Sequence, residues 1–314
     1  MLPQLNTSFS TIQPNLQLFF DSTSLGLLKE CPRKYWFTII QGWVPRSTSV
    51  HLSFGAWYHA ALERYDHARC EGKDHDEALD AAVKYVLEDT WDRELGRMWL
   101  SDEPTKTRWT LLRTVVWYLE YFRHDTMQTL TLANGKPAVE LSFRFETSFK
   151  SQSGEAFWLC GHLDRVAQLG DEIYIVDRKT TKGQLDERYF GGFTPDNQFS
   201  LYSLAGQVVL DLPIRGIVVD AAQIGVGFSR FERRIAPRSK EFLEEWYRET
   251  GTWLEVAERY AELGVWPGNE KSCGNYAGCP FRGVCSKSPQ VRDEWLSAGF
   301  VKRIWDPRQV RGEV

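Results

Sequence analysis

Residues Gly161 to Lys182 read GHLDRVAQLGDEIYIVDRKTTK, and this stretch carries the most information in the chain. Its centre, Gly170–Asp171, is a dipeptide that suits a two-residue hairpin loop, and β-branched and aromatic residues follow it. A loop of this length sets Leu169 opposite Glu172, so the numbers of every directly opposed pair sum to 341. The sequence therefore predicts two antiparallel strands in one defined register.

This register creates a conflict of charge inside the predicted hairpin. Asp164 falls opposite Asp177, and Lys179 shares the face of Asp177 because side chains alternate along a strand. Opposed Cβ atoms lie roughly 4.5–5.5 Å apart, a separation at which two carboxylates repel unless a cation lies between them. A divalent metal ion held by both carboxylates, with an ammonium beside it, resolves the conflict. This combination is typical of a metal-dependent site that cleaves phosphodiesters.

An ordinary structural interpretation competes with this one. Asp164 could pair with Arg165 or Arg178, and Asp177 could simply be a polar residue at the end of a strand. An isolated Asp-x-Lys also occurs by chance in many proteins. The remaining sequence has to decide between the two interpretations.

The composition bounds the class of protein. The chain has 314 residues, 42% of them hydrophobic and 25% charged, which is typical of a globular protein with a substantial core. Its net charge of −4 excludes indiscriminate coating of nucleic acid and leaves room for a local phosphate-binding site. No apolar run is long enough to cross a bilayer, and residues 1–20 do not resemble a secretory signal. We therefore expect a cytoplasmic protein without a membrane partner, in which cysteines bind metal or lie buried instead of forming disulfides.

The periodicity of apolar residues predicts an α/β fold with a mixed central sheet. Most of the first 130 residues read as helices, and strands follow from about residue 138. The expected helices cover residues 53–70, 74–93, 105–125, 196–210, 239–263 and 290–298. The expected strands cover 138–148, the hairpin within 156–179, 214–225 and 228–236.

Two helical pairs could add to the hairpin site. His59 and Glu63 are four residues apart and share a helical face, as do Gln198 and Tyr202. Taken alone, each pair is more typical of surface or packing residues than of a functional site.

Three cysteines in a glycine-containing loop, Cys273, Cys279 and Cys285, are difficult to explain as core residues. Exposed thiols are a liability unless they are ligated, and three thiolates are one short of a four-ligand site. Cys31, in the segment Glu30-Cys31-Pro32, is assigned as the fourth ligand. Four thiolates suit zinc and an iron–sulfur cluster equally, so the residues alone leave both open.

Taken in order, these motifs resemble the RecB-like nucleases of the PD-(D/E)XK superfamily. The matching motifs are Cys31-Pro-x-x-Tyr35, Gly55-x-x-x-His59, Gly161-x-x-Asp164, Asp177-x-Lys179, Gln198-x-x-x-Tyr202 and the C-terminal cysteine trio. The pattern is most similar to CRISPR-associated RecB-like exonucleases, the AddB nuclease domain and phage homologues. It covers about residues 20–290, and six short motifs in one order are much more specific than any one alone.

The resemblance implies a metal-dependent DNA exonuclease acting on single-stranded ends, in recombination, repair or phage or CRISPR-related DNA processing. Asp164, Asp177 and His59 would bind Mg²⁺ or Mn²⁺, and Lys179 would help activate the attacking water. Gln198 and Tyr202 would position DNA.

The resemblance also implies a restriction-endonuclease-like core at residues 131–265, preceded by a helical region at 1–130 and followed by a Cys-ligated cap and tail at 266–314, all within one compact domain. Cys31, Cys273, Cys279 and Cys285 would hold a [4Fe–4S] cluster that joins the two ends of the chain.

Two features depart from the family pattern. The first two C-terminal cysteines are separated by five residues where the family often has two, which keeps zinc open as an alternative. Asp177 stands where many members have Glu. The sequence has no Gly-x-x-x-x-Gly-Lys-Ser/Thr loop, so a helicase or other motor would have to be a separate partner chain.

Two other classes of function compete. The chain could be a catalytically conditional or inactive nuclease-fold subunit that binds DNA within a recombination or CRISPR complex, although Asp164, Asp177 and Lys179 are all present. It could also be an unrelated zinc-stabilised α/β protein in which the hairpin carboxylates are coincidental. The order of the six motifs disfavours this last alternative.

Overall fold

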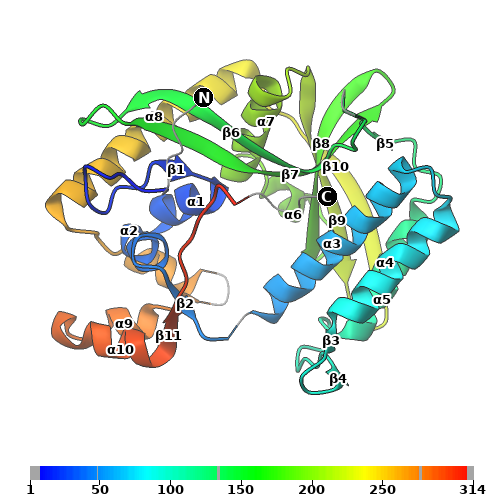
Figure 1. Cartoon of the computed structure of the whole chain (residues 1–314), viewed down its shortest axis with the longest axis horizontal. Helices are drawn as coiled ribbons and strands as arrows, with labels where there is room; N and C mark the ends of the chain where they lie inside the picture. Colours follow the sequence, from blue (N-terminus) through cyan, green and yellow to red (C-terminus); the bar gives the residue numbers. More distant parts are fainter. Residues whose placement is uncertain (1–7, 48, 133–134, 276–277, 310–314) are drawn as a thin grey trace. The chain divides into compact units, whose positions relative to one another are not determined.

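The computed structural model describes residues 8–47, 49–132, 135–275 and 278–309 (Figure 1). Contacts within the chain define two units: unit 1 comprises residues 1–47, 143–161 and 239–313, and unit 2 comprises residues 48–142 and 162–238. The two units are interleaved in the sequence, so the sequential regions proposed above do not coincide with them. Two strands, β6 (Val139–Lys150) and β7 (Ala156–Leu169), run from one unit into the other.

Unit 2 contains three packed helices, α3 (Val50–Cys70), α4 (His75–Asp89) and α5 (Arg108–Tyr121). Asp74 and Thr107 begin α4 and α5 as side-chain caps that accept backbone N–H groups of the first turn. The helices bury a shared apolar cluster that includes Phe54, Tyr58 and Leu111. All three helices were predicted, and their ends differ from the predicted ranges by a few residues.

The strands of unit 2 form a mixed sheet, which confirms the predicted fold class. The C-terminal part of β7 pairs antiparallel with β8 (Glu172–Thr181), and β8 pairs parallel with β9 (Ile214–Ile224). Strand β10 (Ser229–Ala236) pairs antiparallel with β9, and the short β5 (Gln128–Thr129) pairs with β7. The connection from β8 to β9 carries α6 (Glu187–Gly191) and α7 (Asn197–Val209), as a parallel pair requires a crossover.

Helices cover both faces of β8 and β9. Ala222 and Ile224 of β9 belong to the apolar cluster of α3, α4 and α5 on one face. Helix α7 packs on the other face, where Gly206 permits close approach. A Cβ atom at Gly206 would lie 2.7 Å from Cγ1 of Ile214 and 2.9 Å from Cδ1 of Ile175, so a larger residue would displace the helix.

Unit 1 begins with β1 (Phe19–Phe20), α1 (Ser22–Glu30), α2 (Pro32–Tyr35) and a π-helical turn at Trp36–Ile40. Its C-terminal part contains α8 (Lys240–Leu263), α9 (Arg282–Cys285) and α10 (Arg292–Gly299). Strands β2 (Trp43–Pro45) and β11 (Phe300–Lys302) pair antiparallel and bring the two ends of the unit together. In the described part of the chain, no helix combines the length and apolar character needed to cross a membrane.

Candidate active site

The β7–β8 hairpin has the register that the sequence predicted. Residues 165–169 pair with residues 172–176, and Leu169 lies opposite Glu172. The backbone pairing ends at Arg165 and Val176. At the next position toward the open end of the hairpin, a side chain replaces the backbone partner. Oδ2 of Asp164 accepts a hydrogen bond from the backbone N–H of Arg178 at 2.9 Å. The ordinary interpretation in which Asp164 pairs with a neighbouring guanidinium is therefore not what the geometry shows.

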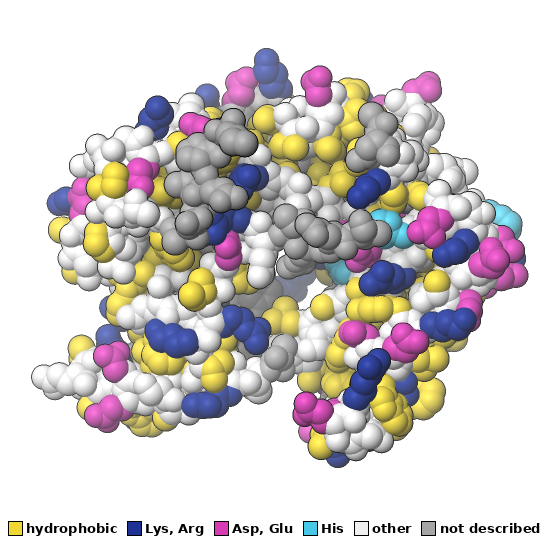
Figure 2. Space-filling model, viewed as in Figure 1, with side chains coloured by type: hydrophobic (Ala, Val, Ile, Leu, Met, Phe, Trp, Pro, Cys, Tyr) yellow, Lys and Arg dark blue, Asp and Glu magenta, His cyan; other side chains and the backbone are white. Residues whose placement is uncertain are grey.

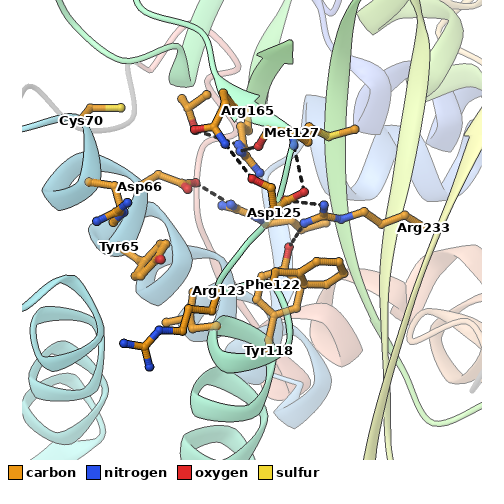
Figure 3. A pocket seen from close by; sticks show the side chains of 15 residues that line it. Tyr65, Asp66, Cys70, Tyr118, Phe122, Arg123, Asp125, Met127, Arg165 and Arg233 are labelled. Atoms are coloured by element: carbon orange, nitrogen blue, oxygen red, sulfur yellow. Dashed lines mark hydrogen bonds and ion pairs between the residues drawn. The ribbon is translucent and has the colours of Figure 1, made fainter. Parts of the chain in front are cut away.

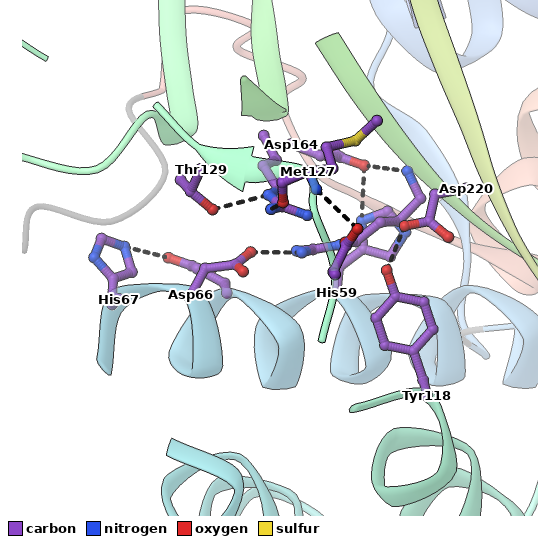
Figure 4. A network of polar contacts seen from close by, with 12 residues as sticks. His59, Asp66, His67, Tyr118, Met127, Thr129, Asp164 and Asp220 are labelled. Carbon is purple, nitrogen blue, oxygen red and sulfur yellow. Dashed lines mark hydrogen bonds and ion pairs between the residues drawn. The ribbon is translucent and has the colours of Figure 1, made fainter. Parts of the chain in front are cut away.

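His59 lies on α3 and points toward Asp164 (Figure 4). Its Nδ1 atom is 3.3 Å from Oδ2 of Asp164. Burial disfavours the protonated imidazole, yet the Asp164 carboxylate outweighs this effect and raises the pKa of His59. Burial opposes ionisation of Asp164 too, but the imidazole and the other cations around it hold the pKa of Asp164 well below its usual range. Asp164 is therefore an anion at neutral pH.

Glu140 adds a carboxylate that the sequence analysis did not find. One ligand atom each from His59, Glu140 and Asp164 lies within 4.8 Å of the others. Glu140 has φ +48°, in the left-handed region that a glutamate rarely adopts. Such strained residues cluster at functional sites because the surrounding structure must hold them there. Among alternating polar residues of a predicted strand, nothing in the sequence distinguishes Glu140.

Asp177 and Lys179 project from the face of β8 that α7 covers. Asp177 is 1% exposed, and Nζ of Lys179 lies 2.6 Å from its Oδ2 atom. Oδ1 of Asp177 has no hydrogen-bond partner among the described residues. Burial, with the Asp164 carboxylate adding to it and Lys179 opposing it, raises the pKa of Asp177 to about 6. Burial lowers the pKa of Lys179, but the Asp177 and Asp164 carboxylates raise it on balance, so Lys179 is a cation.

Gln198 and Tyr202 lie in the first half of α7, where Gln198 contacts Lys179 and Tyr202 contacts Gln198. Oε1 of Gln198 accepts a hydrogen bond from Nζ of Lys179 at 2.9 Å, and its Nε2 donates to the Tyr202 hydroxyl at 2.9 Å. Asp196 caps the helix by accepting the N–H of Phe199, which fixes the start of α7. The structure therefore brings Gln198 and Tyr202 into the same cluster as Lys179.

A buried ionic network supports β8 from its other face. Arg178 pairs with Asp66 of α3 at 2.5 Å, and Figure 4 shows Asp66 and His59 projecting from the same side of that helix. Asp220 of β9 accepts a hydrogen bond from the Tyr118 hydroxyl. Nε of Arg233 lies 3.0 Å from Oδ2 of Asp220. This network ties α3, α5, β8, β9 and β10 together, and the sequence analysis did not identify it.

The visible surface of the α3–α5 helices is not uniformly basic. Figure 2 shows acidic and basic side chains interspersed over these helices, in keeping with pairs such as Lys84–Asp80 and Arg123–Asp76. Attraction of a polyanion to this face must therefore come from particular groups and not from a broad positive field.

The four cysteines assigned to a second metal site all belong to unit 1. Cys31 is buried and precedes α2, and its Sγ atom accepts the backbone N–H of Asn269 at 3.3 Å. Cys279 and Cys285 are half-buried, and burial raises the pKa of both thiols. The Cys273 thiol donates to the carbonyl of the same Asn269 at 3.9 Å. The fold thus gathers residues that are far apart in the sequence.

Comparisons with known proteins give a match to one family of sequences and to several solved structures. A sequence model of the PD-(D/E)XK nuclease superfamily matches residues 22–286. No curated protein matches the chain by sequence. Similar solved structures include a Eubacterium rectale protein provisionally described as an exonuclease, with 13% identity and a TM-score of 0.48 over 88% of this chain and 92% of that one. They also include the protein SSO0001, with 9% identity and a TM-score of 0.35 over 86% of this chain and 87% of that one.

Proposed function

Because the chain belongs to the PD-(D/E)XK nuclease superfamily, we propose that it hydrolyses DNA phosphodiesters with Mg²⁺ or Mn²⁺, as a RecB-like exonuclease acting on single-stranded ends. The observation that carries this proposal is the convergence of His59, Glu140 and Asp164 beside the buried Asp177–Lys179 pair. A metal site of this kind, next to a lysine ammonium, provides the metal ligands and the positive charge that phosphodiester hydrolysis needs.

The donor set fits a hard divalent cation. Carboxylate oxygens are the ligands that Mg²⁺ and Mn²⁺ prefer, and one imidazole is compatible with Mn²⁺. Asp177 supports the fit, because its buried Oδ1 atom has no hydrogen-bond partner among the described residues and the nearby Asp164 carboxylate repels it. The proposed ligands are therefore His59, Glu140, Asp164 and Asp177.

The bound cation would lower the pKa of a water molecule and neutralise charge on the scissile phosphate. Lys179 supplies a fixed positive charge beside Asp177, where it would orient the attacking water and stabilise the developing negative charge. Gln198 accepts a hydrogen bond from the Lys179 ammonium and so limits its movement. Hydrolysis would leave a 5′-phosphate, as in related nucleases.

The test uses end-labelled single-stranded and duplex DNA with Mg²⁺, Mn²⁺ or EDTA. The parent should degrade single strands from an end only with metal, and Lys179→Met should lower the rate by at least about a hundredfold, since an electrostatic group of this kind contributes about 3 kcal/mol or more. Lys182→Met is the matched control, because this lysine is three residues further on and its side chain is 59% exposed.

Each result separates the candidate functions. Parent-like activity of a folded Lys179→Met protein would contradict the mechanism. Tight metal-dependent DNA binding without cleavage would favour the alternative, a conditional or inactive subunit that requires a partner such as a helicase or a recombination or CRISPR protein. Cleavage within a circular single strand would contradict the exonuclease assignment while leaving the nuclease assignment intact.

We also propose that Cys31, Cys273, Cys279 and Cys285 hold a [4Fe–4S] cluster. Cys31 and Cys273 both contact Asn269, so the fold brings the N-terminal cysteine to the C-terminal loop that carries the other three. Four thiolates match the one ligand per iron that such a cluster needs. Binding would also fasten Cys31 to the C-terminal loop and contribute to the stability of unit 1.

Measuring the iron and zinc content of the purified protein tests the cluster proposal. Protein purified without oxygen should contain about four irons per chain and absorb near 400 nm. A Cys279→Ser protein should lose both, whereas Cys70→Ser, at an exposed cysteine of α3, should retain them. Stoichiometric zinc without iron would contradict the iron–sulfur assignment and leave the nuclease proposal untouched.

A further inference from the structure

Unit 2 contains a cavity of about 150 Å³ that the proposed hydrolysis does not use (Figure 3). It lies between α3, α5 and the strands, on the face of β8 that carries Arg178 and not Asp177. Five arginines line it: Arg69, Arg123, Arg165, Arg178 and Arg233. Only two carboxylates, Asp66 and Asp125, are among its lining residues. The lining therefore carries an excess of positive charge.

Three of the five guanidinium groups have acidic partners. Arg178 pairs with Asp66, Arg233 with Asp125 at 2.6 Å, and Arg123 with Asp76 at 3.2 Å. Even in the first of these pairs one donor is unused, because Nε of the buried Arg178 has no hydrogen-bond partner among the described residues. The pair with Asp66 therefore leaves one buried donor of Arg178 unsatisfied.

Arg165 is the unusual residue of the five. It is 6% exposed, and within the part of the chain that the structure describes its guanidinium contacts only neutral oxygens. Nε donates to Oγ1 of Thr129 at 2.9 Å, and Nη2 donates to the carbonyl of Met127 at 2.7 Å. A buried cation without an acidic partner is costly, and an anion bound beside it would offset that cost.

Arg69 completes the arrangement at the exposed rim. Its Nη1 atom donates to the carbonyl of Lys73 at 2.8 Å, and no ion pair with a carboxylate is found for it in the described structure. The cavity thus combines a buried and an exposed guanidinium that both lack acidic partners, with a spare donor on Arg178 between β8 and α3.

We propose that this arginine-lined cavity binds a phosphate group. Guanidinium groups match the oxygens of a phosphate through paired, charge-assisted hydrogen bonds. With a volume of about 150 Å³, the cavity has room for a single phosphate group. The ligand is either free phosphate or the terminal phosphate of a DNA strand. The second source rests on the proposed nuclease function.

The position of the cavity separates it from the candidate metal site. Asp66 follows His59 by seven residues on α3, a rise of roughly 10 Å along the helix. Arg165 and Arg178 directly follow Asp164 and Asp177 in the sequence, and the side chains of Arg178 and Asp177 leave β8 on opposite faces. Phosphate binding can therefore be measured without a metal and without cleavage.

The experiment titrates inorganic phosphate into the metal-free full-length protein, in EDTA, by calorimetry. Arg69→Gln removes an exposed rim group without disturbing the core, and Arg165→Gln removes the buried charge. Arg64→Gln is the matched control, because Arg64 is exposed on the same helix outside the cavity. Each charge-assisted contact contributes about 1.5–3 kcal/mol, so Arg69→Gln should weaken binding at least about tenfold. Arg64→Gln should bind phosphate as the parent does.

Two further measurements place the ligand and identify its source. Bound phosphate should slow alkylation of Cys70, an exposed thiol that lines the same cavity. A 5′-phosphorylated oligonucleotide that binds more tightly than its 5′-hydroxyl counterpart would identify a DNA end as the ligand, and equal affinity would identify free phosphate. Absence of phosphate binding at millimolar concentration, or parent-like binding by both Arg69→Gln and Arg165→Gln, would overturn the proposal. Neither result would affect the nuclease assignment, which is measured by cleavage.

Discussion

Oδ2 of Asp164 accepts the backbone N–H of Arg178 at 2.9 Å, at the point where the pairing of β7 with β8 ends. The carboxylate takes the place of a carbonyl from the neighbouring strand, so the two strands can separate without leaving a buried donor unpaired. The same oxygen atom lies 3.3 Å from Nδ1 of His59. Asp164 therefore combines a structural contact of the hairpin with a place in the candidate metal site.

These two roles of Asp164 should separate on mutation. Asp164→Asn keeps an acceptor for the Arg178 N–H but loses the charge, whereas Asp164→Ala loses both. We expect Asp164→Ala to lower the free energy of unfolding by about 1–3 kcal/mol relative to Asp164→Asn, in urea denaturation without metal. Both variants should bind Mn²⁺ at least about tenfold more weakly in calorimetry, since both lack the anionic ligand. Equal stability of the two variants would show that the hydrogen bond to Arg178 contributes little.

Gln198 should affect turnover more than substrate binding. Gln198→Met removes the acceptor that holds the Lys179 ammonium while keeping the length of the side chain. We expect kcat to fall by about 10–100-fold with a smaller change in KM, because the lysine charge acts mainly in the transition state. Tyr202→Phe removes only the second contact of the amide and should have a smaller effect. A large increase in KM with unchanged kcat would instead indicate that Gln198 binds DNA directly.

Replacing one member of the Asp66–Arg178 pair should destabilise the protein strongly, whereas replacing both with apolar residues should destabilise it little. Both side chains are buried, so either Asp66→Leu or Arg178→Met alone leaves an uncompensated charge and should lower the free energy of unfolding by about 3–5 kcal/mol. The double variant should recover most of this loss. A double-mutant cycle in urea checks the expectation, and strictly additive losses would show that the two groups do not interact.

Because of Lys106, we expect the free energy of unfolding to increase with pH in the alkaline range. This lysine is 2% exposed, its Nζ lies 4.2 Å from the centre of the Phe54 ring, and burial lowers the pKa of Lys106 to about 8. Between about pH 8 and 10.4 the unfolded chain holds a proton on this lysine that the folded chain has released, so the free energy of unfolding rises with pH in this window. Lys106→Met should be more stable than the parent at pH 7, by up to about 3 kcal/mol.

The control for Lys106 is the exposed lysine Lys240, whose side chain is 84% exposed. The gain in stability from Lys106→Met should shrink as the pH approaches about 10.4, whereas Lys240→Met should follow the parent at every pH. A constant gain across the range would mean that the methionine only packs better against Phe54 and that the lysine has no unusual titration.

The register of the β7–β8 hairpin could be predicted from the sequence alone. Gly170–Asp171 specifies a short turn, and the turn with the alternation of side chains specifies the pairing that the structure has. The register, the mixed α/β class and the common face of Asp177 and Lys179 follow from contacts between residues close in the chain. Such contacts depend on local backbone geometry, which the turn residues and the alternation of side chains specify.

Tertiary structure alone decided which distant groups meet. Glu140 looks like any polar position of a strand until folding places it beside His59 and Asp164. The arginines of the arginine-lined cavity come from one helix, the turn after α5 and three strands, so no spacing in the sequence relates them. The physical reason is that turns and periodicity fix the direction of a side chain within its own element, whereas the distance between elements is set by packing of the whole unit.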